Sequence, residues 1–209
     1  MYVLQKQGLL VIPRTELTYP AHTLKMHEKA ATAPVDHVMP DFEDACPYEF
    51  KGDASRKVMV EALNTIDFGN KVIAIRPNNI RSKFFLGDIQ AIMLGAPDRF
   101  HGIILPKTNE PEDIVHLARL LDALEEQGGW TTHIQIEALI EMPLAVVNAY
   151  KIATASPRMA GLTFGIAVSP AFTAHQSSRR SNTFCSGDAA TIFQGPVVIG
   201  KPLAMSKNL

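Results

Sequence analysis

The chain has 209 residues, enough for one sizeable core, with 46% hydrophobic and 20% charged residues. Its formal net charge of −1 gives no electrostatic reason to expect nucleic acid or a membrane surface as a partner, and its apolar runs are far shorter than the roughly 18 residues of a membrane span. The two cysteines, Cys46 and Cys185, form neither a disulfide framework nor a metal-binding spacing, so a reducing, cytoplasmic compartment is expected.

Short apolar runs recur along the chain about every 30 residues, the spacing of repeated βα units. They are Leu9–Pro13, Val35–Met39, Lys71–Ile75, Gly102–Leu105, Thr132–Ile140 and Gly161–Ala167. Near-continuous apolar runs are typical of strands buried on both faces of a parallel sheet. Helical patterns lie between them, most clearly over 54–63 and over 112–126, where Ile114, Leu117 and Leu121 share one face. Pro111 and Gly128 mark the two ends of the second helix.

Repeated strand–helix units fit two α/β architectures, an open doubly wound sheet and an eight-stranded TIM barrel. A doubly wound dinucleotide fold opens with a glycine-rich turn after its first strand, but the residues at that position, 13–16, include no glycine. The chain also has no GxxxxGK[ST] phosphate loop. We therefore predict an incomplete TIM barrel, with about six recognisable βα units over residues 1–167.

In a TIM barrel the active site lies at the carboxyl ends of the strands. Charged side chains stand at or near five of the six predicted strand ends: Arg14; Asp41, Glu43 and Asp44; Arg76; Lys107; Glu137 and Glu141. For a single residue, a solvated strand end is an equally good explanation. Glu137 and Glu141 differ, because they stand within or directly after an apolar run, and a buried carboxylate is costly unless it is paired or binds a cation. Such oxygen donors suit Mg²⁺, and a nearby arginine can hold a carboxylate beside a carbonyl group.

The segment Val35–Cys46, which reads VDHVMPDFEDAC, resembles the D(L/F)EDA signature of the citrate lyase β-subunit and malyl-CoA lyase proteins in the HpcH/HpaI aldolase family. Further motif matches follow in the family's order: Lys51 with Arg56, Ile75–Asn78, Leu105–Lys107, Ile136–Glu141, Ala153–Arg158 and Phe164–Gly165. The matches cover about residues 8–167. Each motif is short, so the ordered set carries the resemblance.

This resemblance implies a TIM barrel that uses Mg²⁺ to cleave a CoA or acyl-carrier thioester into a smaller acyl thioester and a 2-oxo acid. Glu141 would then bind Mg²⁺, and Arg76 would bind the carboxylate and the oxygen of the 2-oxo acid. Glu43 and Asp44 would hold metal-bound waters. The resemblance also implies a homo-oligomer, either a trimer or a hexamer.

Other charged residues receive weaker assignments. Arg14 and Lys25 are candidates for contacts with CoA phosphates, although a solvated loop and helix face would explain both equally well. Lys107 is expected to support the site through ion pairs. Glu137 is expected to support the metal ligands without binding the metal itself. Three of the seven histidines, His22, His27 and His37, have no ligand spacing and are interpreted as structural or surface residues.

The resemblance stops at Val168, where the family's FG..D motif places the aspartate that is its second metal ligand. Residues 168–209 carry four Lys/Arg and one Asp, a net charge of +3, which leaves −1 − 3 = −4 for the preceding part. Two further βα units would need about 60 residues, and 42 remain (209 − 167). We therefore treat residues 168–209 as an atypical tail produced by a frameshift or gene-model error, with genuine divergence as the alternative. The nucleotide sequence around codon 168 would decide between them.

Three functions remain open from the sequence. The first is a Mg²⁺-dependent carbon–carbon lyase that cleaves malyl-CoA, citramalyl-CoA or a citryl thioester. The second is a catalytically impaired binding or regulatory protein, or a truncated gene product. The third is an aldolase that acts on a free 2-oxo acid aldol without CoA.

Overall fold

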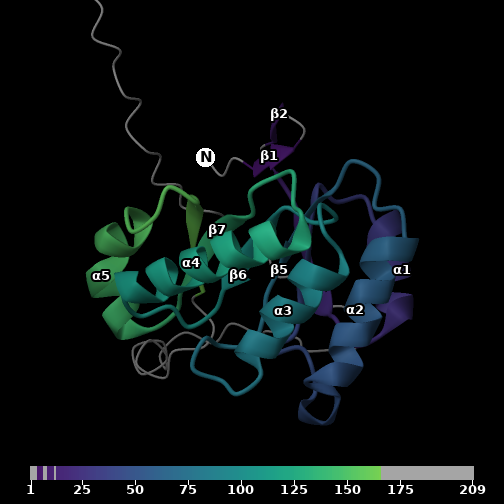
Figure 1. Ribbon diagram of the computed structural model, residues 1–209, viewed down its shortest axis with the longest axis horizontal. Coiled ribbons are helices and arrows are strands. Elements are labelled where there is room, and N and C mark those ends of the chain that lie inside the picture. Colours follow the sequence, from purple (N-terminus) through teal and green to yellow (C-terminus); the bar gives the residue numbers. More distant parts are fainter. Residues whose placement is uncertain (1–3, 7–8, 12, 166–209) are drawn as a thin grey trace, which may run out of the picture.

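The computed structural model describes residues 4–6, 9–11 and 13–165 (Figure 1). Six parallel strands form one sheet in the order β3-β4-β5-β6-β7-β8, which is also their order in the chain. Their bounds are β3 Glu16–Pro20, β4 His37–Asp41, β5 Val72–Ile75, β6 Gly102–Leu105, β7 Gln135–Ile140 and β8 Met159–Phe164. This arrangement confirms the predicted α/β class, with six parallel strands among the described residues.

A helix follows each of the first five strands of this sheet, and the helices lie together along one side of it (Figure 1). They are α1 Leu24–Thr32, α2 Asp53–Thr65, α3 Phe85–Gly95, α4 Pro111–Gly128 and α5 Pro143–Ala153, with a short 3₁₀ helix, η1 Tyr48–Phe50, before α2. The sequence explains both ends of α4. Pro111 occupies its first turn, Glu110 and Asp113 form a reciprocal capping box, and Gly129 ends it in the left-handed conformation at φ 67°.

The predicted first strand is wrong. Residues 9–11 form β2 (Leu9–Val11), which pairs antiparallel with β1 (Leu4–Lys6) in a separate two-stranded sheet. The first strand of the parallel sheet is β3, whose sequence ELTYP alternates polar and apolar residues. Strand β3 pairs with β4 alone among the described strands, so it is an edge strand and lacks the continuous apolar run on which the prediction relied.

The core has two parts because side chains alternate between the two faces of each strand. The larger part lies between the sheet and the helices and includes Val38, Ile73, Ile103 and Ile136. The smaller part comprises Met39, Ala74, Ile104 and Leu139, one residue from each of β4 to β7. These four side chains define the inner face of the sheet, the face turned away from the helices.

The sheet is open at both edges among the described residues, since β3 and β8 each have one partner. This is the arrangement of the first six units of a barrel. The predicted boundary at 167/168, Val168 and the altered seventh and eighth strands lie outside the described residues. Within the described part of the chain, none of the helices has the length and apolar character needed to cross a membrane.

Candidate active site

The inner face continues past the carboxyl ends of the strands as a row of charged side chains. Asp41, Arg76 and Glu141 each stand two residues after an inner-face core residue of β4, β5 and β7, so the alternation of the strands turns all three to the same side. The parallel pairing of β4 and β5 extends to a bridge between Asp41 and Arg76. The structure thus brings charged groups from separate strands to one end of the sheet, as predicted for the site.

Arg76 is held in place by Asp41. Its Nε and Nη2 donate to the two carboxylate oxygens of Asp41 at 2.7 and 2.6 Å, a bidentate pair. Burial alone would lower the pKa of Arg76, but the hydrogen bonds and the charge of Asp41 outweigh it and raise that pKa. Because Asp41 is fully buried and Arg76 keeps 13% of its side chain exposed, the guanidinium is fixed and can still be reached from outside.

Lys107 connects the loop after β6 to the loop after β4. Its ammonium donates to Glu43 Oε1 at 2.6 Å and to Asp44 Oδ1 at 3.2 Å. Burial raises the pKa of Glu43, and the hydrogen bond from Lys107 opposes that rise without cancelling it. Oε2 of Glu43 is buried and has no hydrogen-bond partner among the described residues. Glu43 therefore offers one oxygen to a ligand, while 45% of the Asp44 side chain is exposed to solvent.

The backbone of Lys107 also contacts Glu141. Lys107 has a φ of 50°, in the left-handed region that residues other than glycine seldom adopt. In this conformation its amide donates to Glu141 Oε1 at 2.6 Å. Burial raises the pKa of Glu141, and the Lys107 amide together with the positive charge of Arg76 opposes the rise. Lys107 thus contacts all three carboxylates assigned to the site, which fits the supporting role expected for it.

Glu137 lies deeper on the inner face than Glu141. It is 3% exposed, and its Oε1 accepts a hydrogen bond from Thr163 on β8. The end of β8 also approaches Glu141. A Cβ added to Gly165 would lie 3.4 Å from Glu141 Oε2, so this glycine leaves room beside the carboxylate.

A second layer of polar residues supports the loops that carry the site. Lys51 Nζ donates to Asn78 Oδ1 at 2.7 Å and to two main-chain carbonyls of the loop after β4. Asn78 in turn donates to Asp88 at 2.7 Å, and Arg56 donates to the other oxygen of Asp88 at 2.8 Å. The sequence analysis assigned no role to Asp88. Its position as the one charged residue of helix α3 is the signal that could have found it, because a fully buried aspartate needs partners.

The structure places the two predicted CoA contacts at opposite ends of the sheet. Lys25 is exposed in the first turn of α1, on the same side as the site. Arg14 precedes β3 and pairs with Asp36, which precedes β4, at the amino-terminal end. Its expected position at the exit of a strand is therefore wrong, because the strand assigned to residues 9–13 belongs to the separate hairpin. The predicted second metal position, Val168, lies outside the described residues.

The site has the right donors for Mg²⁺ but few of them. Glu43, Asp44 and Glu141 are hard oxygen ligands, and the partnerless oxygen of Glu43 is the kind of group that a bound cation or its water would satisfy. Among the described residues, no three His, Cys, Asp or Glu side chains gather closely enough to hold a metal ion. The residues present fit a Mg²⁺ that keeps several water ligands and takes one carboxylate directly from this chain.

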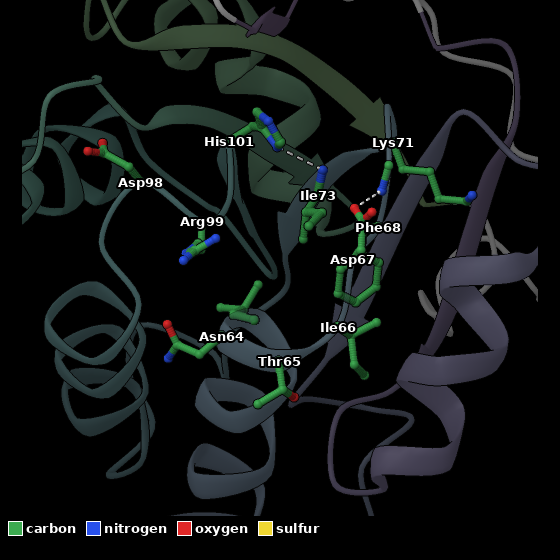
Figure 2. A pocket seen from close by; sticks show the side chains of 12 residues that line it. Asn64, Thr65, Ile66, Asp67, Phe68, Lys71, Ile73, Asp98, Arg99 and His101 are labelled. Carbon is green, nitrogen blue, oxygen red and sulfur yellow. Dashed lines mark hydrogen bonds between the residues drawn. The ribbon is translucent and has the colours of Figure 1, made fainter.

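A hollow of about 350 Å³ lies at the other end of the sheet, around the start of β5 and the segment before β6 (Figure 2). Its polar groups hold the surrounding loops. Nδ1 of His101 accepts from the Ile73 amide at 3.0 Å, and Asp98 accepts hydrogen bonds from Thr131 and Thr132. Active sites of βα-barrels form at the opposite end, so we do not assign the chemistry to this hollow.

Comparisons with known proteins identify the family of this chain. The family model for HpcH/HpaI aldolase/citrate lyase matches residues 14–168. An L-malyl-CoA/beta-methylmalyl-CoA lyase of Cereibacter sphaeroides is 31% identical over 154 residues, which cover 74% of this chain and 48% of that protein. A citrate lyase subunit beta of Leuconostoc mesenteroides is 35% identical over 152 residues, covering 71% and 48%. The chain thus spans about half the length of the curated relatives it matches.

A solved structure shows the same fold. Protein CitE from Mycobacterium tuberculosis, crystallised in complex with magnesium and acetoacetate, matches with a TM-score of 0.61 and 25% identity. The match covers 79% of this chain and 59% of that one. The family model spans all six described strands of the parallel sheet, and the matched residues include Asp41, Arg76 and Glu141. The chain belongs to the HpcH/HpaI aldolase/citrate lyase family.

Proposed function

We propose that this chain carries the substrate-binding half of a Mg²⁺-dependent carbon–carbon lyase. The substrate would be a 3-hydroxyacyl-CoA-type thioester such as malyl-CoA, citramalyl-CoA or a citryl thioester, cleaved into an acyl thioester and a 2-oxo acid. The observation that carries the proposal is the Asp41–Arg76 pair. It presents a fixed, partly exposed guanidinium on the same inner face as Glu141.

Each site residue has a defined task in this proposal. Arg76 uses the donors that Asp41 leaves free to bind the carboxylate of the 2-oxo acid. Glu141 binds Mg²⁺ directly, and Glu43 and Asp44 hold its water ligands. When bound, Mg²⁺ would supply Lewis-acid stabilisation of the negative charge that develops on oxygen during cleavage. Lys107 keeps the three carboxylates in place and offsets their charge before the ion binds.

Position 168 is the observation that favours the second candidate, a binding or regulatory protein with impaired catalysis. The side chain of valine has no oxygen that could bind a metal. Even the loss of a residue that only hydrogen-bonds to the metal ligands typically lowers metal affinity or activity about 10–100-fold. An aldolase that acts on a free 2-oxo acid aldol is the third candidate. We also propose that the chain is cytoplasmic. We propose that it forms trimers or hexamers, because β8 has one partner among the described strands and an unpaired edge favours association.

Metal and substrate titrations separate the candidates. Isothermal titration of the full chain with Mg²⁺ in the presence of pyruvate should show saturable binding, and Glu141→Gln should lose it. The exposed carboxylate variant Glu61→Gln on α2 serves as the control and should bind like the wild type. Absence of Mg²⁺ binding by the wild type would exclude the lyase. If Mg²⁺ binds, turnover of malyl-CoA but not of free malate supports the lyase. The reverse supports the aldolase, and no turnover of either supports the binding protein.

A further inference from the structure

A string of hydrogen-bonded side chains connects the loops after β4 and β5 to helices α2 and α3. We call Lys51, Asn78, Asp88 and Arg56 the polar relay. Lys51 follows η1 in the loop after β4, and Asn78 lies two residues after Arg76 in the loop after β5. Three of the four members stand in the sequence motifs, yet none of them has a task in the proposed function.

Lys51 joins the two loops with all three protons of its ammonium group. Its Nζ donates to the main-chain carbonyls of Phe42 and Glu43 at 3.0 and 2.6 Å, and to Asn78 Oδ1 at 2.7 Å. An ammonium has three donors and no acceptor, so these three contacts use its full capacity for hydrogen bonds. Lys51 therefore has no donor left for a substrate, and its influence on the site must pass through the residues that it holds.

The rest of the relay fixes the orientation of Asn78. Its Nδ2 donates to Asp88 Oδ2 at 2.7 Å, and its main-chain amide donates to the same oxygen at 3.1 Å. Arg56 Nε donates to Asp88 Oδ1 at 2.8 Å. Both Asn78 and Asp88 are buried. A reversed Asn78 amide would place its NH₂ group against the Lys51 ammonium and its oxygen against the Asp88 carboxylate, so the relay permits one arrangement of this side chain.

Glu43 is the site residue that this relay reaches. Lys51 holds its main-chain carbonyl, and Lys107 holds Oε1 of its side chain at 2.6 Å. The two lysines thus fix Glu43 at its backbone and at one carboxylate oxygen. The other oxygen, Oε2, is buried and has no hydrogen-bond partner among the described residues. An oxygen held in this way can accept a hydrogen bond from a metal-bound water with little loss of conformational freedom.

We propose that Lys51 is a positioning residue of the site and that it acts on the bound metal through Glu43. Its contact with Asn78 keeps the loop after β4 aligned with the strand end that carries Arg76. Without the ammonium, the Glu43 carboxylate would be free to move away from the metal-bound waters. This inference rests on the proposed function, because it requires Mg²⁺ in the site. It adds a residue that touches neither the ion nor the substrate.

A double-mutant cycle with Glu43 tests this role. Isothermal titration of the full chain measures the dissociation constant of Mg²⁺ in the presence of pyruvate, and Glu141, the direct ligand, is retained throughout. Lys51→Met should raise that constant about 10–100-fold, the usual effect of losing a residue that orients metal ligands. In a Glu43→Ala background the same substitution should change it by no more than about twofold, because the carboxylate that Lys51 positions is already gone. Lys57→Met, at an exposed lysine of α2, should bind like the wild type.

A general loss of structure would give a different pattern, since Lys51→Met would then weaken Mg²⁺ binding equally in both backgrounds. That outcome would overturn the proposal, and so would wild-type affinity in Lys51→Met. Circular dichroism and thermal unfolding show whether each variant is folded at the temperature of the titration. Where Lys51→Met is unfolded, Lys51→Gln takes its place in the cycle, because its amide keeps two donors.

Failure of the proposed function gives a separate result. A wild-type chain that binds no Mg²⁺ in the presence of pyruvate excludes the lyase and, with it, this role of Lys51. If the wild type binds Mg²⁺ and Glu141→Gln does not, the proposed function stands. The cycle between Lys51 and Glu43 then decides the positioning role alone.

Discussion

The two ends of the parallel sheet both carry acidic residues, but the two sets differ in pKa. At the amino-terminal end, hydrogen bonds from Arg14 lower the pKa of Asp36. Burial opposes ionisation of Asp98 and Glu125, yet hydrogen bonds from Thr131 and Thr132 to Asp98, and from Arg158 to Glu125, lower both pKa values. Hydrogen bonds and ion pairs within the protein therefore stabilise the ionised form of these carboxylates.

At the carboxyl end of the sheet, burial affects the pKa of the carboxylates more strongly than their hydrogen bonds do. Burial raises the pKa of Glu43 and of Glu141, and the contacts with Lys107 only partly oppose it. The protein therefore keeps two carboxylates in surroundings that disfavour their charge, which is the condition that a cation or a ligand would relieve. The comparison shows why counting charged residues at strand ends does not locate a functional site. A buried carboxylate whose pKa is raised indicates a binding site more strongly than a carboxylate whose pKa is lowered by its partners in the protein.

The largest effect should come from breaking the Asp41–Arg76 pair at the carboxyl end. Asp41→Ala leaves Arg76 without its bidentate partner in a mostly buried position, so we expect the free energy of unfolding to fall by about 3–5 kcal/mol. Asp36→Ala, which removes the partner of the exposed Arg14, should cost much less. Urea denaturation followed by circular dichroism measures both. Equal losses would mean that Arg76 is not held as the structure describes.

Glu125→Gln and Glu43→Gln should act in opposite directions at pH 7. The lowered pKa of Glu125 contributes stability that is present above its unfolded pKa and lost as pH falls through the folded value. The raised pKa of Glu43 contributes a penalty that is absent below its unfolded pKa and develops as pH rises to the folded value. Removing the charge of Glu125 should therefore cost about 1.5–3 kcal/mol.

Removing the charge of Glu43 should keep or raise the Tm at pH 7, since Lys107 retains Asp44 as a partner. Thermal unfolding from pH 4 to pH 8 separates the two variants. The difference between Glu43→Gln and the wild type should shrink toward pH 4, whereas that between Glu125→Gln and the wild type should begin to shrink only below the unfolded pKa of glutamate. A Tm for Glu43→Gln well below that of the wild type at pH 7 would contradict the comparison.

The backbone of Lys107 should have a smaller effect. Lys107→Gly and Lys107→Val both remove the ammonium, but glycine accepts a φ of 50° freely and valine does not. We expect the valine variant to be less stable than the glycine variant by about 1–2 kcal/mol. The same two substitutions at Lys83, which does not have a positive φ, provide the control. There the glycine variant should not be the more stable of the two.

The smallest effect should come from Arg14. Its side chain is 83% exposed, and it pairs with Asp36 at the end of the sheet opposite the site. Arg14→Ala should leave both the Tm and the binding of CoA, measured by isothermal titration, close to those of the wild type. A clear loss of CoA binding in this variant would restore Arg14 as a CoA contact.

The sequence by itself predicted most of the fold. Continuous apolar runs predicted β4 to β8 because buried parallel strands have little polar surface, and Pro111 with Gly128 predicted the limits of α4 to within one residue. The same rule missed β3, since an edge strand carries polar residues and so has no such run. Motif matches also identified Arg76, Glu43 and Glu141 as site candidates, because charge directly after an apolar run is visible in the sequence.

The tertiary structure alone decided which of these residues meet. Asp41 and Arg76 are 35 residues apart in the sequence, and Glu43 and Lys107 are 64 apart. Their contacts arise from the register between neighbouring strands, which turns every second side chain of each strand to the inner face. The left-handed backbone of Lys107 and the partnerless oxygen of Glu43 likewise depend on packing between loops. Sequence patterns report the local preference of each segment, whereas the site is made by distances between segments.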